Sequence, residues 1–209
     1  MKIFYRRYLP HIQPPGTTLF VTFRLHGSLP RDVLFRLRQE YEQFAKQLKG
    51  LSKTRAKLEL DRFQKRLIVQ CDRILDLSDR GPQFLKDPRI AQLVCETMQF
   101  WDQQRYDLLS YCVMSNHVHV VFTPLPKQDG TFYSLAKIMH SIKSYTANKA
   151  NEMLMRRGKP FWEHESFDHY CRDENEVERV VAYVLNNPVK AGLVDDARAW
   201  PWNYCKFWN

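Results

Sequence analysis

The chain has 209 residues, with 32 Lys and Arg against 23 Asp and Glu, so its formal net charge is +9 at pH 7. A hydrophobic share of 44% excludes a disordered or fibrous chain, and this length fits one domain, or one domain with an insertion. The surplus of positive charge makes a polyanion such as nucleic acid the first partner to consider.

Export, membrane insertion and a disulfide framework are not expected from the sequence. No apolar run approaches the roughly 20 residues that span a bilayer, and residues 1–10 lack the apolar segment of a signal peptide. The five Cys residues are odd in number and contain no CxxC pair. A cytoplasmic protein with reduced cysteines therefore fits best.

The first clear element is a strand over residues 17–25, where apolar residues alternate after a Pro-Pro-Gly break, and we expect one of its faces to be buried. Residues 30–70 have a helical, charge-rich pattern. Residues 31–73 contain twelve basic and six acidic side chains, which accounts for +6 of the total charge. A solvated helical hairpin and a DNA contact explain this surplus equally well.

The middle of the chain predicts a helix, a strand hairpin and a second helix. Residues 88–103 have the spacing of an amphipathic helix. Residues 106–113 and 117–123 have the composition of two strands joined by a tight turn, which indicates an antiparallel hairpin. Residues 132–157 follow as another amphipathic helix.

The last predicted elements are a strand at 161–172 and a helix at 173–186. Asp173 can cap this helix, Glu176 lies at the reciprocal capping position, and Pro188 follows its end.

Strand, helix, two strands, helix, strand is the order of a ferredoxin-like βαββαβ unit with an antiparallel sheet. We therefore expect a single α+β domain over residues 1–209, with a helical insertion at about 31–87 and a last helix after the unit.

His117 and His119 are the sharpest local feature of the sequence. Alternate residues of a strand point to one face, so both imidazoles project together while Val118 and Val120 face a core. Two adjacent imidazoles can bind one divalent cation. An isolated HxH motif is, however, more often a pair of ordinary strand histidines, because three-residue matches arise by chance.

Tyr183 lies off the apolar stripe of the helix at 173–186, so its phenol faces a polar surface. Without the two histidines, a partly buried tyrosine at the edge of a helix interface would be the better interpretation. Asn187 follows four residues later and can offer an amide oxygen to a cation, or it can cap the end of the helix.

These residues resemble the single-tyrosine HUH transposases, in particular the REP-associated branch. The resemblance lies in MSNHVHVVF at 114–122, which contains the histidine-hydrophobic-histidine strand, and in YVLNNPVKAGLV at 183–194, which is similar to the tyrosine helix and the turn after it. Shorter similarities are YRR at 5–7, the strand at 16–25, FWE at 161–163 and FDH at 167–169. The helical stretch at about 31–87 is longer than this branch leads us to expect.

The resemblance implies a ferredoxin-like fold and cleavage of single-stranded DNA, often beside a hairpin, through a covalent 5′-phosphotyrosine. Tyr183 then matches the nucleophile and His117 and His119 match the metal pair. Asn187 occupies the place of a polar residue that can complete the metal site. A mixed set of nitrogen and oxygen ligands suits Mg²⁺ or Mn²⁺.

Single-stranded DNA is held by cationic side chains and by aromatic rings on which bases stack. The candidates are Arg6, Arg7, Arg24, Lys143 and Lys149, with Trp162, Trp200 and Trp202 as stacking surfaces. For each of them, solvated charge or ordinary aromatic packing is the more frequent explanation. A monomer and a homodimer, with the tyrosine helix acting in cis or in trans, are both compatible with the sequence.

Three functions remain open at this point. The first is a metal-dependent DNA strand transferase that uses Tyr183. The second is a non-catalytic protein that binds DNA hairpins on the same fold. The third is a metal-dependent hydrolase in which His117 and His119 activate water and Tyr183 is structural. A replication initiator or relaxase fits less well, because the chain is short and has no attached helicase.

Overall fold

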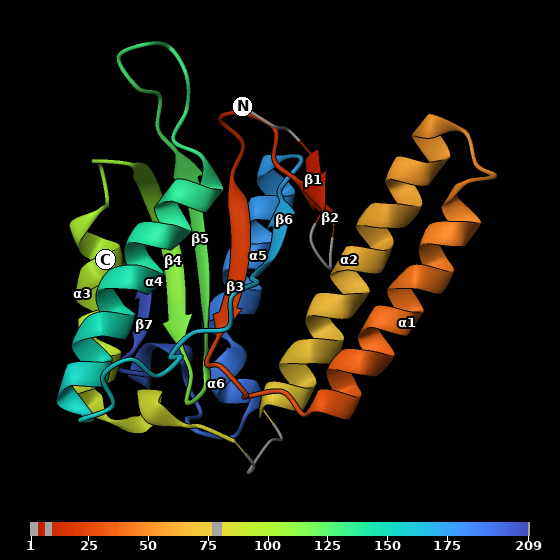
Figure 1. Ribbon diagram of the computed structural model, residues 1–209. Coiled ribbons are helices and arrows are strands. Elements are labelled where there is room, and N and C mark those ends of the chain that lie inside the picture. The colour runs from red at the N-terminus through yellow and green to blue at the C-terminus, as the bar shows by residue number, and fades with distance from the viewer. Residues whose placement is uncertain (1–3, 7–9, 77–80, 209) are drawn as a thin grey trace.

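A computed structural model describes residues 4–6, 10–76 and 81–208 (Figure 1). Its centre is an antiparallel sheet with the strand order β6-β3-β5-β4-β7. These strands are β3 (Leu19–Arg24), β4 (Tyr106–Val113), β5 (His117–Pro124), β6 (Phe167–Tyr170) and β7 (Asn203–Cys205). The four strands of the predicted βαββαβ unit lie in the order fourth, first, third, second, and β7 extends the sheet beside β4. The predicted ferredoxin-like fold is confirmed.

The register of β3 and β5 sets up one face of the sheet. Thr22 lies opposite His119, and Arg24 lies opposite His117. Directly opposed residues of an antiparallel pair project to the same face, so Thr22 and His119 are neighbours there. The predicted hairpin of β4 and β5 is confirmed, and the backbone N–H of Met114 donates to the carbonyl of His117 at its turn.

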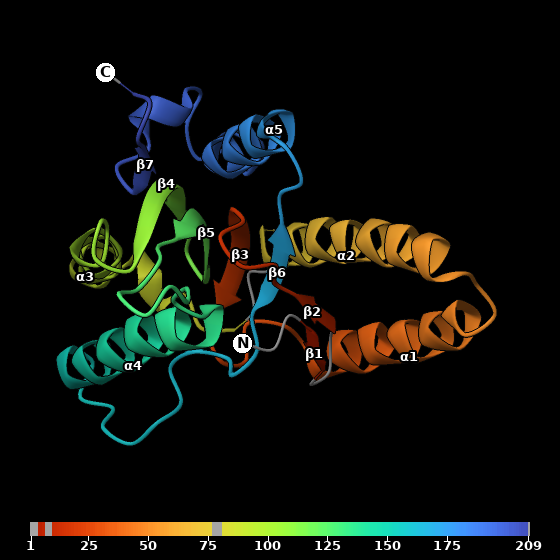
Figure 2. The ribbon, with the colours of Figure 1, turned by 90° about the horizontal axis from the view of Figure 1, so that it is seen from above.

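Helices cover both faces of the sheet (Figure 2). On one face, α3 (Pro88–Phe100) and α4 (Leu135–Met153) pack on the alternate residues of β5 that include Val118. On the other face, α5 (Glu174–Leu185) packs through residues such as Val184. All six residues of β3 are buried. The prediction of one buried face for this strand was wrong, because helices from distant parts of the chain cover the second face.

The long helical stretch forms a hairpin of α1 (Arg31–Leu48) and α2 (Lys53–Asp76), which projects beyond β6 (Figures 1 and 2). The two helices pack through apolar residues spaced four apart. These are Val33, Leu37 and Tyr41 on α1, with Phe63, Leu67, Cys71 and Leu75 on α2. Ile68 of α2 joins the cluster between α5 and the sheet, so the hairpin is packed against the face that carries the two histidines.

The remaining elements are short and were not predicted. They are β1 (Phe4–Arg6), β2 (Pro10–Ile12), η1 (Phe84–Lys86), α6 (Asn187–Lys190) and η2 (Ala197–Ala199). The strand expected at 161–172 is limited to β6, with one isolated bridge between Leu25 and Trp162. Of the described helices, none has both the length and the apolar character needed to cross a membrane.

Candidate active site

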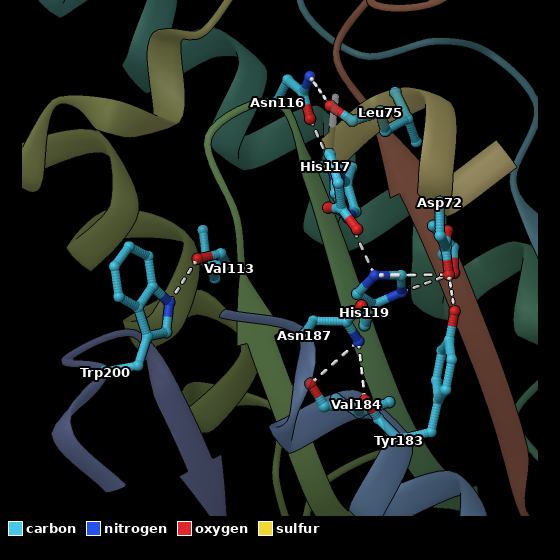
Figure 3. Close-up of polar contacts among 12 residues, drawn as sticks. Asp72, Leu75, Val113, Asn116, His117, His119, Tyr183, Val184, Asn187 and Trp200 are labelled. Carbon is cyan, nitrogen blue, oxygen red and sulfur yellow. Dashed lines mark hydrogen bonds and ion pairs between the residues drawn. The ribbon is translucent and has the colours of Figure 1, made fainter. Parts of the chain in front are cut away.

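The imidazoles of His117 and His119 lie side by side on the face of β5 that is covered by α2 and α5 (Figure 3). Both residues are 0% exposed, and their Nε2 atoms are 3.0 Å apart. Val118, between them, points into the opposite core. The strand alternation therefore brings the two nitrogens together, as the sequence predicted.

The hydrogen bonds around the two rings determine which nitrogens are free. Nδ1 of His117 lies 2.7 Å from the Asn116 Oδ1, while the amide nitrogen of Asn116 donates to the carbonyl of Leu75. Because an amide oxygen only accepts, His117 carries its hydrogen on Nδ1 and presents a bare lone pair at Nε2.

The second ring contacts a hydroxyl that can serve either tautomer. Nδ1 of His119 lies 2.8 Å from the Thr22 Oγ1. A threonine hydroxyl both donates and accepts, so His119 can donate from Nε2 to His117, or can present a second bare lone pair when Thr22 accepts. The latter arrangement aims two lone pairs at one point, which suits a shared cation.

Burial keeps both rings uncharged. It lowers the pKa of His117 and that of His119 to about 3, far below the ordinary value for histidine. At neutral pH both imidazoles are therefore neutral, and this is the form that binds a metal ion.

Tyr183 reaches the same place from α5. Its ring centroid is 6.2 Å from that of His119, and its hydroxyl donates to the Asp72 Oδ2 at 2.5 Å (Figure 3). Burial and the neighbouring carboxylate of Asp72 raise the pKa of this phenol. The ammonium of Lys190 lies 3.8 Å from the centroid of the Tyr183 ring, so a cationic group is next to the phenol.

Asp72 is a member of this site that the sequence analysis missed. It belongs to α2, and its Oδ2 lies 3.7 Å from the His119 Nε2. Among the described residues, Asp72, His117 and His119 form a group whose ligand atoms lie within 4.8 Å of one another. Asp76, one turn later, places its Oδ1 3.9 Å from the His117 Nε2.

A signal for Asp72 exists in the sequence. Ile68, Cys71 and Leu75 are buried on α2 at helical spacing, and Asp72 falls on this same stripe. A carboxylate on an apolar stripe is costly to bury unless it has a partner or a role. Asp72 was not singled out because the same segment contains many other charged residues that are exposed.

The charges of the site fit a divalent cation. Burial raises the pKa of Asp72 to about 6, and burial together with Asp72 raises that of Asp76 to about 6, so both carboxylates are mostly ionised at neutral pH. Among the described residues, the Asp72 Oδ1 and the Asp76 Oδ1 are both buried and have no hydrogen-bond partner. Two neutral imidazoles with carboxylate oxygens form a ligand set that suits Mg²⁺ or Mn²⁺.

Asn187 lies next to the imidazoles at the start of α6 (Figure 3). Both of its hydrogen bonds are donated by Nδ2, to the carbonyls of Tyr183 at 2.9 Å and Val184 at 3.2 Å. These are carbonyls of the last turns of α5, which are left open where the helix ends. These contacts fit the helix-end role that the sequence left as one alternative. They engage only Nδ2, so the expected role of the amide oxygen as a metal ligand stays a prediction.

The basic residues expected to hold DNA lie in different environments. Arg24 is 4% exposed and lies 3.4 Å from Glu163, which favours a structural role over the expected DNA contact. Lys149 is exposed and pairs with Glu152. Arg7 and the side chain of Arg6 lie outside the described residues.

A cleft of about 1160 Å³ lies on the other side of the sheet, between α4 and residues 158–166. Lys143 lines it, and its ammonium donates to the carbonyl of Glu163 and to the hydroxyl of Ser166. The cleft does not contain His117 or Tyr183, so it is separate from the candidate chemistry.

The expected stacking residues are largely packed into the protein. Trp162 is buried in the core, and its indole N–H donates to Thr146. The indole N–H of Trp200 donates to the carbonyl of Val113 (Figure 3), and Trp202 is partly buried against the core of α3 and α4. Ordinary aromatic packing accounts for these positions.

Comparisons with known proteins converge on one family. The sequence profile described as "Transposase IS200 like" matches residues 82–187, just over half of the chain. A Haemophilus influenzae protein assigned as a REP-associated tyrosine transposase is 22% identical over 132 residues, which cover 61% of this chain and 74% of that protein. A solved REP-associated tyrosine transposase bound to a REP hairpin aligns with a TM-score of 0.52 and 18% identity, over 95% of this chain and 80% of that one. At this identity the structural likeness concerns the fold.

Proposed function

Because the chain belongs to the IS200-like transposase family, we propose that it nicks and rejoins single-stranded DNA in a metal-dependent reaction with Tyr183 as nucleophile. One observation carries the proposal. The phenol of Tyr183 and the imidazoles of His117 and His119 come from α5 and β5, and they meet around the carboxylate of Asp72. A nucleophile, a hydrogen-bond acceptor for its proton and a pair of neutral metal ligands are the parts that such a reaction requires.

In the proposed step, the phenolic oxygen of Tyr183 forms a bond to the phosphorus of a DNA phosphodiester. The bond from that phosphorus to the 3′-oxygen breaks, so the phosphate stays attached to the 5′ side of the DNA as a phosphotyrosine. Asp72 already accepts the hydrogen bond of the phenol and is placed to receive its proton. The departing 3′-oxygen takes up a proton from solvent water and leaves as a hydroxyl.

A divalent cation held by His117 and His119 would orient the phosphate and offset the charge that develops in the transition state. The reverse attack, by another 3′-hydroxyl on the phosphotyrosine, rejoins DNA without a nucleotide cofactor. The energy of the phosphodiester bond is conserved in the protein-linked intermediate.

We propose hairpin or repeated palindromic DNA as the substrate. The net charge of +9 favours a polyanion, and the structural relative was solved with a REP hairpin. Both observations also fit a protein that binds hairpins without cutting them, so the test must detect the covalent product.

The test is a denaturing-gel assay of the full chain with end-labelled single-stranded hairpin DNA and Mn²⁺ or Mg²⁺, with Tyr183→Phe alongside. We expect a protein-linked DNA band that is absent with Tyr183→Phe and with chelator. Cleavage that persists in Tyr183→Phe would instead support a metal-dependent hydrolase. Binding without cleavage across varied hairpins would support the non-catalytic hairpin binder.

A further inference from the structure

Helix α2 is held against the sheet and α5 by contacts on both sides of Asp72. Towards its start, Asp61 lies in a group of buried charges, where it pairs with Arg172 and lies 3.5 Å from His169. Lys65 bridges Asp61 to Glu176 of α5. These contacts fix the helix some three turns before Asp72.

The second contact lies one turn after Asp72. The amide of Asn116 donates to the carbonyl of Leu75 at 3.0 Å, and the same amide holds the ring of His117 through its oxygen. The end of α2 and the first imidazole are therefore positioned by one side chain, which couples the hairpin directly to the site.

Between these two contacts, the carboxylate of Asp72 is buried and only partly satisfied. The residue is 2% exposed. Its Oδ2 accepts from Tyr183 and faces His119, while its Oδ1 has no hydrogen-bond partner among the described residues. A buried carboxylate with an open oxygen is destabilising unless a proton or a cation occupies the position.

We propose that Asp72 is the third protein ligand of the cation, so that the helical hairpin completes the metal site. The inference rests on the proposed function, because it takes His117 and His119 as the other two ligands. When each metal–ligand bond is about 2.1 Å long, two ligand atoms at a right angle about the metal are roughly 3.0 Å apart. Two ligand atoms on opposite sides of the metal are roughly 4.2 Å apart. The separations of 3.0 Å between the two Nε2 atoms and 3.7 Å from His119 to Asp72 both lie within this range. Asp76 lies 3.9 Å from His117, but among the described residues only Asp72 groups with both imidazoles, so Asp72 is the assigned ligand.

The amide nitrogen of Asn187 is engaged with the carbonyls of Tyr183 and Val184, which fixes the end of the tyrosine helix. Its amide oxygen takes part in neither bond, but it is neutral, so we expect it to contribute less to cation binding than the Asp72 carboxylate does. A carboxylate has about four lone-pair positions on two oxygens. Asp72 can therefore bind a cation and still accept the hydrogen bond of Tyr183, which links the nucleophile to the metal site.

The test measures Mn²⁺ binding to the full chain without DNA, from the loss of the free Mn²⁺ signal in electron paramagnetic resonance. The variants are Asp72→Asn, the near-isosteric Asp72→Leu, Asn187→Ala, and Asp76→Asn, which removes a nearby negative charge from the same helix. We expect both Asp72 variants to lose at least about tenfold in affinity, and Asp76→Asn and Asn187→Ala to lose less than about threefold. Thermal unfolding followed by circular dichroism confirms that each variant is folded.

The double variant His117→Ala, His119→Ala separates this inference from the proposed function. If it loses Mn²⁺ binding while both Asp72 variants keep the wild-type affinity, the third-ligand assignment is wrong and the metal pair stands. If the wild-type chain binds no Mn²⁺, or binds it equally well without the two histidines, both proposals fail. An affinity that falls with Asn187→Ala and not with Asp72→Asn would return the third position to Asn187.

Discussion

Tyr183 donates its phenolic hydrogen to Asp72 across 2.5 Å, although the two residues are 111 positions apart in the sequence. The contact joins the helix that follows the βαββαβ unit to the hairpin inserted near its beginning. It also places a negative charge beside the proposed nucleophile, which adds to burial in raising the pKa of the phenol. A cation at Asp72 would offset that charge and make the phenol easier to deprotonate.

The first prediction concerns the stability of the metal-free protein. Burial raises the pKa of Asp72 to about 6 in the folded state, above its value in an unfolded chain, so the ionised carboxylate opposes folding at neutral pH. We expect Asp72→Asn to raise the free energy of unfolding at pH 7.5 by about 1–3 kcal/mol. Urea denaturation with chelator present measures this change.

Addition of Mn²⁺ supplies the control. Wild type should gain stability with metal concentration, and Asp72→Asn should gain much less. A variant that is less stable without metal, or that is stabilised by Mn²⁺ as strongly as wild type, would contradict the prediction.

The second prediction concerns Asn116, which orients His117 and holds the end of α2. Residues that position metal ligands commonly contribute about 10–100-fold in affinity. We expect Asn116→Ala to weaken Mn²⁺ binding by that factor, as measured by the same titration. Asn203→Ala is the control, since the Asn203 amide likewise holds backbone, through the carbonyls of Leu185 and Ala197, but contacts neither histidine. Equal losses in the two variants would mean that a general loosening of the fold is responsible.

The third prediction concerns Lys190, whose ammonium lies over the ring of Tyr183. A cation at this position favours the negative charge that develops on the phenolic oxygen during attack. We expect Lys190→Met to slow formation of the protein–DNA adduct by roughly 10–100-fold under single-turnover conditions. Removal of a nearby positive charge should not weaken Mn²⁺ binding, so a parallel loss of metal affinity would argue against this role. Lys86→Met, at an exposed site in η1, serves as the control.

The fourth prediction concerns pH and the charges that hold α2 to α5. Although burial alone would raise it, hydrogen bonds from Lys65, the backbone of Arg172 and His169 lower the pKa of Glu176 to about 2. The folded-state pKa is thus below the unfolded value of about 4.3. Glu176 therefore contributes stability that is present above pH 4.3 and is lost as the pH falls towards 2.

We expect the unfolding free energy of metal-free wild type to decrease more steeply between pH 4.5 and 3 than that of Glu176→Gln. The difference in slope should approach about 1.4 kcal/mol per pH unit. Denaturant titrations at a series of pH values measure it. Parallel curves for the two proteins would show that Glu176 is not tied into the charge group in solution.

Much of the fold followed from local patterns in the sequence. The strands at β3, β4 and β5 and the helices α3, α4 and α5 have clear two-residue or 3.6-residue periods, and their order indicated the ferredoxin-like unit. The three-residue strands, including β7, could not be predicted, because so short a segment has no period and depends on the edge strand that it joins. Burial of the second face of β3 was not predicted for a similar reason, because the helices that cover this face are distant in the sequence.

The candidate site was predicted only where its residues are close in sequence or match a known pattern. His117 and His119 share a face of one strand, and Tyr183 stands in a segment that resembles the tyrosine helix of the family. Asp72 joins them through the packing of the helical hairpin, and no local period indicates which side chain it will contact. Arg24 was expected at a DNA surface because of its charge, yet it is buried and pairs with the partly buried Glu163.

The most direct test of the central claim is to identify the residue that becomes attached to DNA. Wild-type protein is incubated with a hairpin oligonucleotide and Mn²⁺, the adduct is digested with nuclease and trypsin, and the peptides are sequenced by mass spectrometry. We expect a nucleotide phosphate on the tyrosine of the tryptic peptide at residues 180–190, which carries Tyr183. Cleaved DNA with a free 5′-phosphate and no modified peptide, or a phosphate linked to a different residue, would contradict the assignment of Tyr183 as the nucleophile.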